Sequence, residues 1–152
     1  MPSVSILIGS KSDQEVMAAC EQYLSYFGID YELKVLSAHR NPVECVEYVH
    51  SSEKNGTKLF IAAAGMAAHL PGVVASHTTL PVIGVPLSGS ELNGVDALYS
   101  IVQMPAGIPV ATVAIGKAGA RNSAVLAAEI LGITDSAIKA KLAEFRKNGS
   151  KI

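Results

Sequence analysis

Three apolar segments of the chain are each followed by a short loop whose side chains could do chemistry. The segments, each paired with its loop, are 4–8 with 9–13, 31–36 with 37–42, and 59–63 with 64–72. If these segments are neighbouring strands of a parallel sheet, the loops leave their carboxyl ends at one edge, where ligands bind in open α/β folds. The spacing therefore predicts one site, suited to a small phosphorylated molecule.

The first loop has the residue types of a phosphate site. Gly9 lets the chain turn sharply off the strand, and Ser10 and Ser12 offer hydroxyls beside the free N–H groups of a following helix. Asp13 repels phosphate and is better suited to accept hydrogen bonds from two ribose hydroxyls. Alternatively, Ser12 and Asp13 only cap the helix, since Ser12 and Glu15 have capping-box spacing with Ser12 as N-cap. The sequence leaves both interpretations open.

The second loop carries the sharpest catalytic signal. A histidine can both give and take a proton near neutral pH, which makes His39 a candidate general acid–base. Arg40 supplies a permanent cation whose fork of donors matches phosphate. The alternative is an ordinary surface pair at a strand end. The site interpretation is favoured because the loop falls at the binding edge and because Ser37 and Asn41 can hold it in a defined shape.

The third loop could bind a carboxylate through successive backbone N–H groups. Gly65 permits an unusual backbone angle there. His69 either braces the loop or acts as a proton partner behind a catalytic group. No pair of histidines has the helical spacing of a metal site, so we predict no metal. His50 and His77 are interpreted as ordinary solvated residues.

The alternation of strands and helices predicts the fold. Strands are expected at 4–8, 31–36, 59–63, 82–85 and 110–115, with helices between them. This order is typical of a three-layer α/β/α sandwich with a five-stranded parallel sheet, of flavodoxin-like type. In the helix that starts after Asn41, Val43, Val46 and Val49 are expected to face the core. Apolar residues of the last segment predict an amphipathic C-terminal helix: Ile138, Leu142 and Phe145. A single domain over 1–152 is expected.

Composition narrows the possible partners. Charged residues make up only 16% of the chain, against roughly 25% in an average soluble domain. This shortage favours a homo-oligomer that buries part of its surface. The net charge of −1 argues against a nucleic-acid or membrane partner. The absence of a signal-peptide pattern and the two widely spaced cysteines, Cys20 and Cys45, predict a cytoplasmic protein with reduced thiols.

A non-enzymatic module of the same shape is the alternative from another class. A phosphoacceptor receiver needs acidic residues at the end of the first strand, where this chain has Gly9 and Ser10. A flavin carrier usually stacks the ring on aromatic side chains, and aromatic residues make up only 5% of the chain, with no tryptophan. Both features favour an enzyme.

Four ordered motifs resemble the PurE family, the N5-carboxyaminoimidazole ribonucleotide mutases of purine synthesis. They are Gly9-Ser10-Lys11-Ser12-Asp13, Ser37-Ala38-His39-Arg40-Asn41-Pro42, Ala67-Ala68-His69-Leu70-Pro71-Gly72 and Ser100-Ile101-Val102-Gln103-Met104-Pro105. The resemblance runs from about Val4 to Leu131 and is to the bacterial mutase class. The related class, which carboxylates aminoimidazole ribonucleotide directly with CO2, typically has Lys where Arg40 stands. Met66 departs from the pattern, since many mutases have Gly there.

The resemblance implies a reaction and a role for each residue. A carboxyl group moves from the exocyclic nitrogen of the ribonucleotide to C4 of its imidazole, without ATP, metal or organic cofactor. His39 would be the general acid–base. The remaining implied roles are phosphate binding by Ser12, Ser37 and Arg40, ribose binding by Asp13, and enclosure of the carboxylate and transient CO2 by Ser10, Gly65, Met66, His69 and Leu70. Family members form octamers with sites near subunit contacts.

Overall fold

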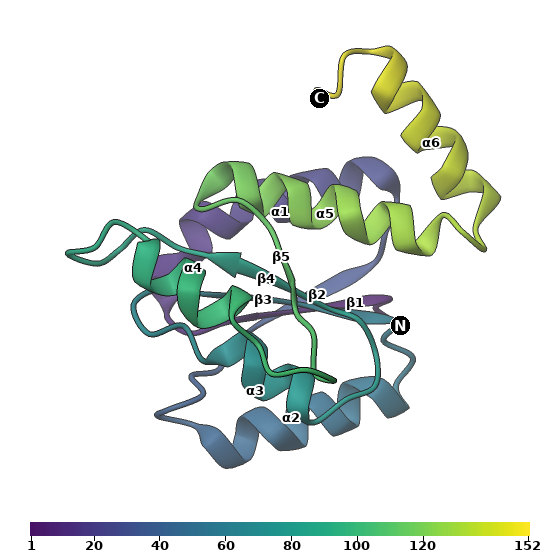
Figure 1. The fold of residues 1–152 in the computed structure, drawn as a ribbon. Helices are drawn as coiled ribbons and strands as arrows, with labels where there is room; N and C mark the ends of the chain where they lie inside the picture. Colours follow the sequence, from purple (N-terminus) through teal and green to yellow (C-terminus); the bar gives the residue numbers. More distant parts are fainter.

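A computed structural model describes all residues 1–152 and contains one five-stranded parallel sheet with helices on both faces (Figure 1). The strands lie in the order β2-β1-β3-β4-β5. Their bounds are β1 Val4–Ile8, β2 Tyr31–Val35, β3 Leu59–Ala64, β4 Val82–Pro86 and β5 Ala111–Thr112. The helices are α1 Gln14–Phe27, α2 Pro42–Lys54, α3 Leu70–Ser76, α4 Val95–Val102, α5 Lys117–Leu131 and α6 Ser136–Lys147, and a 3-10 turn, η1, covers Lys11–Asp13.

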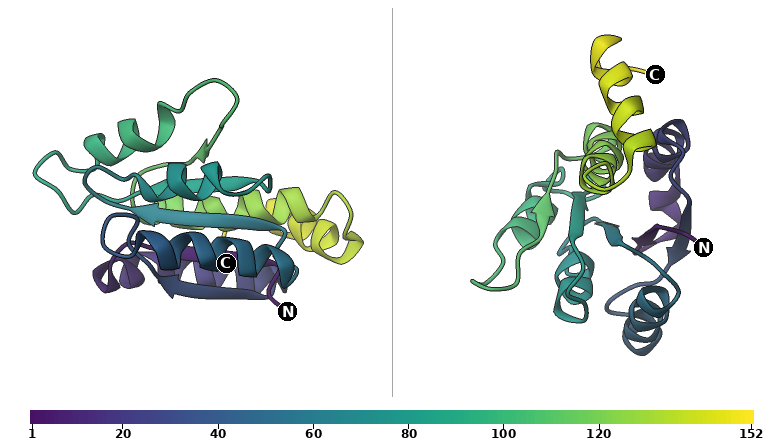
Figure 2. Two further views of the ribbon diagram at one scale, coloured as in Figure 1. Left: turned by 90° about the horizontal axis from the view of Figure 1, so that it is seen from below. Right: turned by 90° about the vertical axis from the view of Figure 1, so that its right-hand side faces the viewer.

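The central strands β1, β3 and β4 are buried on both sides, which explains their nearly continuous apolar sequences. Their side chains alternate between two cores, because successive strand residues point to opposite faces. Ile61 belongs to the core under α1 and α5, whereas its neighbour Phe60 belongs to the core under α2, α3 and α4. Figure 2 shows these two helical layers on either side of the sheet. The predicted sandwich of flavodoxin-like type is confirmed.

The C-terminal helix packs outside this sandwich, against α1 and α5 (Figure 1). Phe145 is almost fully buried and meets Phe27 and Tyr23 edge to face, with ring centroids 5.3 and 5.9 Å apart. The Asp135 carboxylate caps the helix by accepting hydrogen bonds from the N–H groups of Ala137 and Ile138. The predicted amphipathic helix is therefore present.

The strand order explains why the loops meet. β1 lies between β2 and β3, and the connections after β1 and β3 leave in opposite directions, α1 to one face and α3 to the other. Such a switch point opens a crevice outside the carboxyl ends of the two strands. The loops after β1, β2 and β3 all leave at this end of the sheet.

Two expectations about the elements were wrong. Only Ala111 and Thr112 form β5, because beyond them Val113 and Gly116 alone donate to β4 carbonyls and no regular ladder continues. In α2 the buried face carries Cys45, Val49 and Ser52, whereas Val43 is 64% exposed. Val43 precedes the buried Cys45 by two residues, which is about 200° around the helix, so it lies on the side opposite the buried face.

None of the helices combines the length and the apolar character that crossing a membrane requires.

Candidate active site

A cavity of about 490 Å³ lies at the carboxyl edge of the sheet. The loops after β1, β2 and β3 all contribute to its wall, as expected for neighbouring parallel strands. The wall includes every residue that the sequence singled out as a site residue: Ser10, Ser12, Asp13, Ser37, His39, Arg40, Gly65, Met66, His69 and Leu70. The serine turn, the His-Arg pair and the Gly/His loop therefore share one pocket.

The first loop is held by a capping box, but not at the predicted position. Ser10 is the N-cap of η1, and its hydroxyl accepts from the Ser12 N–H at 3.4 Å, while its own N–H donates to Asp13 Oδ2 at 3.1 Å. The prediction of Ser12 and Glu15 was wrong because the chain makes one 3-10 turn before α1 begins at Gln14. The hydroxyls of Ser10 and Ser12 lie 2.9 Å apart and face the cavity.

Asp13 caps the turn without being confined to that role. Its Oδ2 caps the turn, and the residue also lines the cavity. Burial raises the pKa of the Asp13 carboxyl above its usual range, and the hydrogen bond from the Ser10 N–H offsets part of that rise. A partly desolvated carboxylate with Oδ1 unpaired is a good acceptor for the hydroxyls of a ligand.

A tight turn presents His39 and Arg40. The Ser37 hydroxyl accepts from the Arg40 N–H at 3.2 Å, and the Ser37 carbonyl accepts from the Asn41 N–H at 2.8 Å. Asn41 occupies the N-cap position of α2, which starts after it as predicted, but its side chain accepts from the Ser37 N–H instead of capping the helix.

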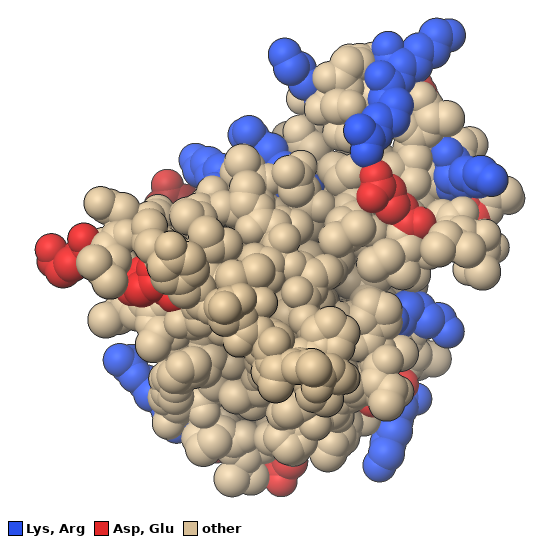
Figure 3. Space-filling view, viewed as in Figure 1, with Lys and Arg blue, Asp and Glu red and all other residues tan.

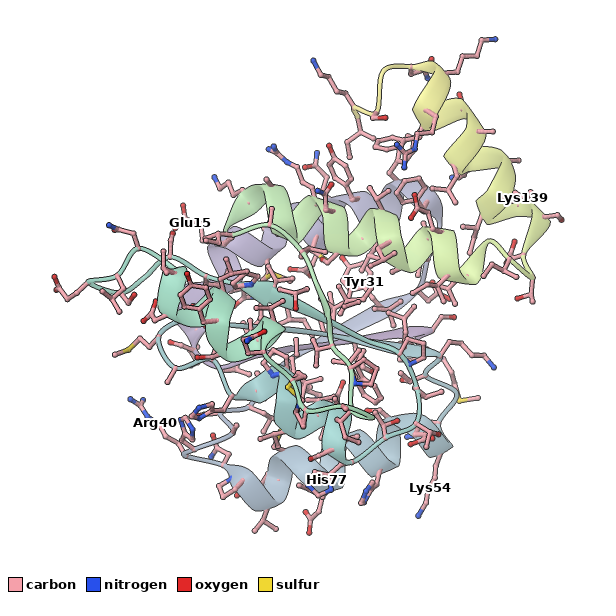
Figure 4. All side chains as sticks on the ribbon, viewed as in Figure 1. Glu15, Tyr31, Arg40, Lys54, His77 and Lys139 are labelled. Carbon is pink, nitrogen blue, oxygen red and sulfur yellow. The ribbon has the colours of Figure 1, made fainter.

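The Arg40 guanidinium is free to bind an anion. Arg40 is exposed, and the one salt bridge of the molecule lies elsewhere, between Arg146 and Glu129. In Figure 4 the Arg40 side chain extends away from the ribbon at the sheet end, far from α6. A guanidinium without an internal partner keeps all its donors for a ligand.

The imidazoles of His39 and His69 meet across the cavity. His39 Nε2 lies 2.7 Å from His69 Nδ1, and the rings stand nearly perpendicular, at 86°, with centroids 4.8 Å apart. This hydrogen bond joins the second loop to the third, over 30 residues of sequence. It could not be read from spacing, because neither residue type nor local pattern encodes a contact between loops.

The unusual backbone angle of the third loop occurs one residue later than expected. Met66, with φ of 55°, takes the left-handed conformation, and Gly65 does not. The side chain of Met66 is 66% exposed although it borders the cavity. A left-handed L-residue is strained by about 1–2 kcal/mol, and little burial compensates for this strain here. Gly at this position would be free of strain.

The sequence interpretation missed Gly89, which lies in the loop between β4 and α4 and completes the cavity wall. The fourth strand was predicted, and its loop leaves at the same edge, so the small residues Ser88, Gly89 and Ser90 were an available signal.

The fourth motif does not line the cavity. A side chain at Gly72 of α3 would lie 3.2 Å from Met104 Sδ, so this motif supports the third loop from behind.

Both cysteines are free and buried. Burial raises the pKa of the Cys20 thiol to about 12, which keeps this group protonated and unreactive. No group of three or more His, Cys, Asp or Glu side chains in the chain is arranged to hold a metal ion.

Comparison with known proteins identifies relatives over almost the whole chain. The model of the AIR carboxylase family matches residues 3–151. N5-carboxyaminoimidazole ribonucleotide mutase of Saccharolobus solfataricus is 53% identical over 148 residues, which is 97% of this chain and 92% of that protein. The mutase of Thermotoga maritima is 54% identical over 147 residues, covering 97% and 85%. The crystal structure of Treponema denticola PurE matches with a TM-score of 0.89 at 30% identity, over 99% of this chain and 92% of that chain. This chain is therefore a member of the AIR carboxylase family.

Proposed function

We propose that the chain is an N5-carboxyaminoimidazole ribonucleotide mutase of purine biosynthesis. It would move a carboxyl group from the exocyclic nitrogen of the ribonucleotide to C4 of the imidazole ring. One observation carries the proposal: a chain more than half identical to such mutases gathers His39, Arg40, the serine turn and the Gly/His loop around one cavity.

The phosphate and ribose of the substrate would bind to the first two loops. Ser12, Ser37 and Arg40 offer two hydroxyls and a guanidinium on one side of the cavity, which is the donor set that a phosphate requires. Asp13 would accept hydrogen bonds from the ribose hydroxyls, and these donors would offset the desolvation of its carboxylate. The imidazole ring would then lie toward the third loop.

His39 would be the general acid–base of the transfer. It gives a proton to the exocyclic nitrogen as the bond to the carboxyl group breaks, which releases CO2. Ring C4 then bonds to the CO2, and His39 takes the C4 proton. The proton given equals the proton taken, so the scheme needs neither a redox partner nor a cofactor. Ser10 and the loop from Gly65 to Leu70, including Met66, would surround the carboxylate and the transient CO2.

The transfer requires an enclosed site, because CO2 held beside the ring recombines faster than CO2 that escapes. In a single chain, His39, Arg40, Met66 and His69 are all exposed. We infer that other copies of the chain close the site in a homo-oligomer, as an octamer. The apolar surface of α4 supports this step: Tyr99 is 63% exposed, and Val95 and Val102 on the same helix are also exposed. Figure 3 shows almost no charged side chain over this face.

The location and the partners follow from the same proposal. A ribonucleotide substrate and reduced thiols at Cys20 and Cys45 fit the predicted cytoplasmic location, which stays a prediction. The proposal includes no nucleic-acid and no membrane partner.

The experiment is a turnover assay with the purified chain. With N5-carboxyaminoimidazole ribonucleotide and no bicarbonate, we expect the ring-carboxylated product to accumulate. Turnover only of aminoimidazole ribonucleotide with added bicarbonate would instead assign the chain to direct carboxylation. Absence of product in both assays would refute the proposed function.

A further inference from the structure

His39 and His69 form a hydrogen bond whose geometry determines which nitrogen is free to react. His39 Nε2 and His69 Nδ1 are 2.7 Å apart, a distance at which one nitrogen carries the shared proton and the other offers a lone pair. His39 Nδ1 makes no hydrogen bond within the chain, whereas Nε2 is occupied. Any proton exchanged with a ligand while this bond persists must therefore pass through Nδ1 of His39.

The direction of the shared hydrogen bond sets the chemistry of Nδ1. When His39 Nε2–H donates to His69, neutral His39 has a lone pair on Nδ1 and can act as a base. Protonated His39 keeps the same bond and carries a second N–H, on Nδ1, which it can give away. One arrangement of the pair thus serves both halves of a cycle in which a proton is first given and then taken.

We propose that His69 is a positioning residue that accepts the Nε2–H of His39 and keeps Nδ1 as the reacting nitrogen. The inference depends on the proposed mutase activity. The Nδ1 proton goes to the exocyclic nitrogen of the substrate while the electron pair of the breaking bond stays on that nitrogen, and CO2 leaves. C4 then bonds to CO2, and the C4 proton returns to Nδ1. His69 neither gains nor loses a proton, in the manner of a group that only orients a catalytic imidazole.

A purely loop-bracing role for His69 explains less of the geometry. The third loop is already held by the His69 N–H, which donates to the Ala67 carbonyl at 2.8 Å, and by the buried residues Leu70 and Pro71 of α3. The imidazole itself is exposed, and its one hydrogen bond is to His39. Asp13 and Arg40 are the other ionisable groups that line the cavity, and neither hydrogen-bonds to either ring.

Two substitutions at His69 separate orientation from bracing. His69→Leu removes the acceptor, and we expect kcat to fall by about 10²-fold or more with little change in KM. His69→Asn places an amide oxygen near the position of Nδ1, so most of kcat should return. His77→Leu is the matched control. His77 pairs edge to face with His50, with centroids 5.9 Å apart, and lies outside the cavity, at the lower end of the molecule in Figure 4.

Nitrogen NMR of ring-labelled, substrate-free protein tests the inference without any turnover. Neutral His39 should be the Nε2–H tautomer in the unaltered chain and in His69→Asn, and a mixture of tautomers in His69→Leu. A neutral His39 protonated on Nδ1 in the unaltered chain, or wild-type kcat in folded His69→Leu, would overturn the proposal. A chain with the expected tautomers but no mutase activity would contradict the proposed function alone.

Discussion

His39 lies exposed at the turn before α2, and the one hydrogen bond of its imidazole within the chain is to His69. Asparagine fills a similar volume but cannot transfer a proton at neutral pH. We therefore expect His39→Asn to lower kcat by at least about 10²-fold. The affinity for the product, measured by calorimetry, should stay close to that of the unaltered protein, because the proposed phosphate and ribose contacts lie on other residues. Turnover near the wild-type rate would refute the acid–base role.

Arg40 presents the one unpaired guanidinium that lines the cavity. Removing a charged hydrogen-bonding partner of phosphate costs about 1.5–3 kcal/mol, so Arg40→Ala should raise KM by about 10- to 150-fold. The difference in KM between Arg40→Ala and the unaltered protein should shrink as the salt concentration increases, because ions screen the attraction between the guanidinium and the phosphate. Arg121→Ala, on the exposed side of α5 and outside the cavity, is the control for a general loss of positive charge. An unchanged KM in Arg40→Ala would contradict the phosphate role.

Met66 adopts a conformation that glycine would adopt without strain. Met66→Gly should relieve about 1–2 kcal/mol of backbone strain and lose about 0.5–1 kcal/mol to the greater freedom of unfolded glycine. The free energy of unfolding should therefore rise by about 0.5–1 kcal/mol, as measured by urea titration. A decrease would mean that the Met66 side chain stabilises the folded state through contacts made in the oligomer.

At the scale of elements, the first turn of α5 packs closely against the chain that follows β5. A Cβ at Gly119 would lie 1.6 Å from the carbonyl oxygen of Ala114, a backbone atom that cannot move aside alone. Gly119→Ala should therefore reduce the free energy of unfolding by more than about 3 kcal/mol.

Gly89→Ala is the control for this substitution, since a Cβ there meets nothing within 4 Å. The free energy of unfolding of the Gly89→Ala protein should differ from that of the unaltered protein by less than about 0.5 kcal/mol. Equal melting temperatures for Gly119→Ala and the unaltered protein would show that the junction between β5 and α5 can rearrange.

The elements differ in how well their sequences predict them. β1 and β3 were predicted because a continuous apolar segment between loop residues is typical of a covered parallel strand. β5 was predicted too long because Val113 and Ile115 continue the apolar pattern although only part of this edge segment pairs with β4. The cap of the first helix was misplaced because Ser10 and Asp13 have the same spacing as Ser12 and Glu15.

At the scale of the whole molecule, one face carries almost no charge. Between Val95 and Gly116 the only charged residue is Asp96, and this stretch forms α4 and the segment that leads to β5. Burying this face against other copies removes apolar surface from water, which is the main driving force of such contacts. The same contacts would close the exposed side of the cavity.

Introducing charge on α4 tests this assembly. The double variant Tyr99→Lys, Val102→Lys should elute as a smaller species in size-exclusion chromatography with light scattering, because two lysines would have to be desolvated at the contact. Its kcat should fall as well, because CO2 would escape from an open site. Lys139→Glu on α6, which Figure 4 shows on the side of the molecule opposite Arg40, should keep the mass of the unaltered protein. An unchanged mass for the double variant would place the contact elsewhere.

The sequence by itself determined the fold class and the three loops that form most of the cavity wall, because hydrophobic periodicity and the parallel-strand rule bring the loops after β1, β2 and β3 to one edge. Only the tertiary structure decided the 2.7 Å contact between His39 and His69, the left-handed backbone at Met66 and the place of Gly89 in the wall. The reason is physical. Periodicity records which face of an element is buried, whereas distances between loops depend on how all the elements pack at once.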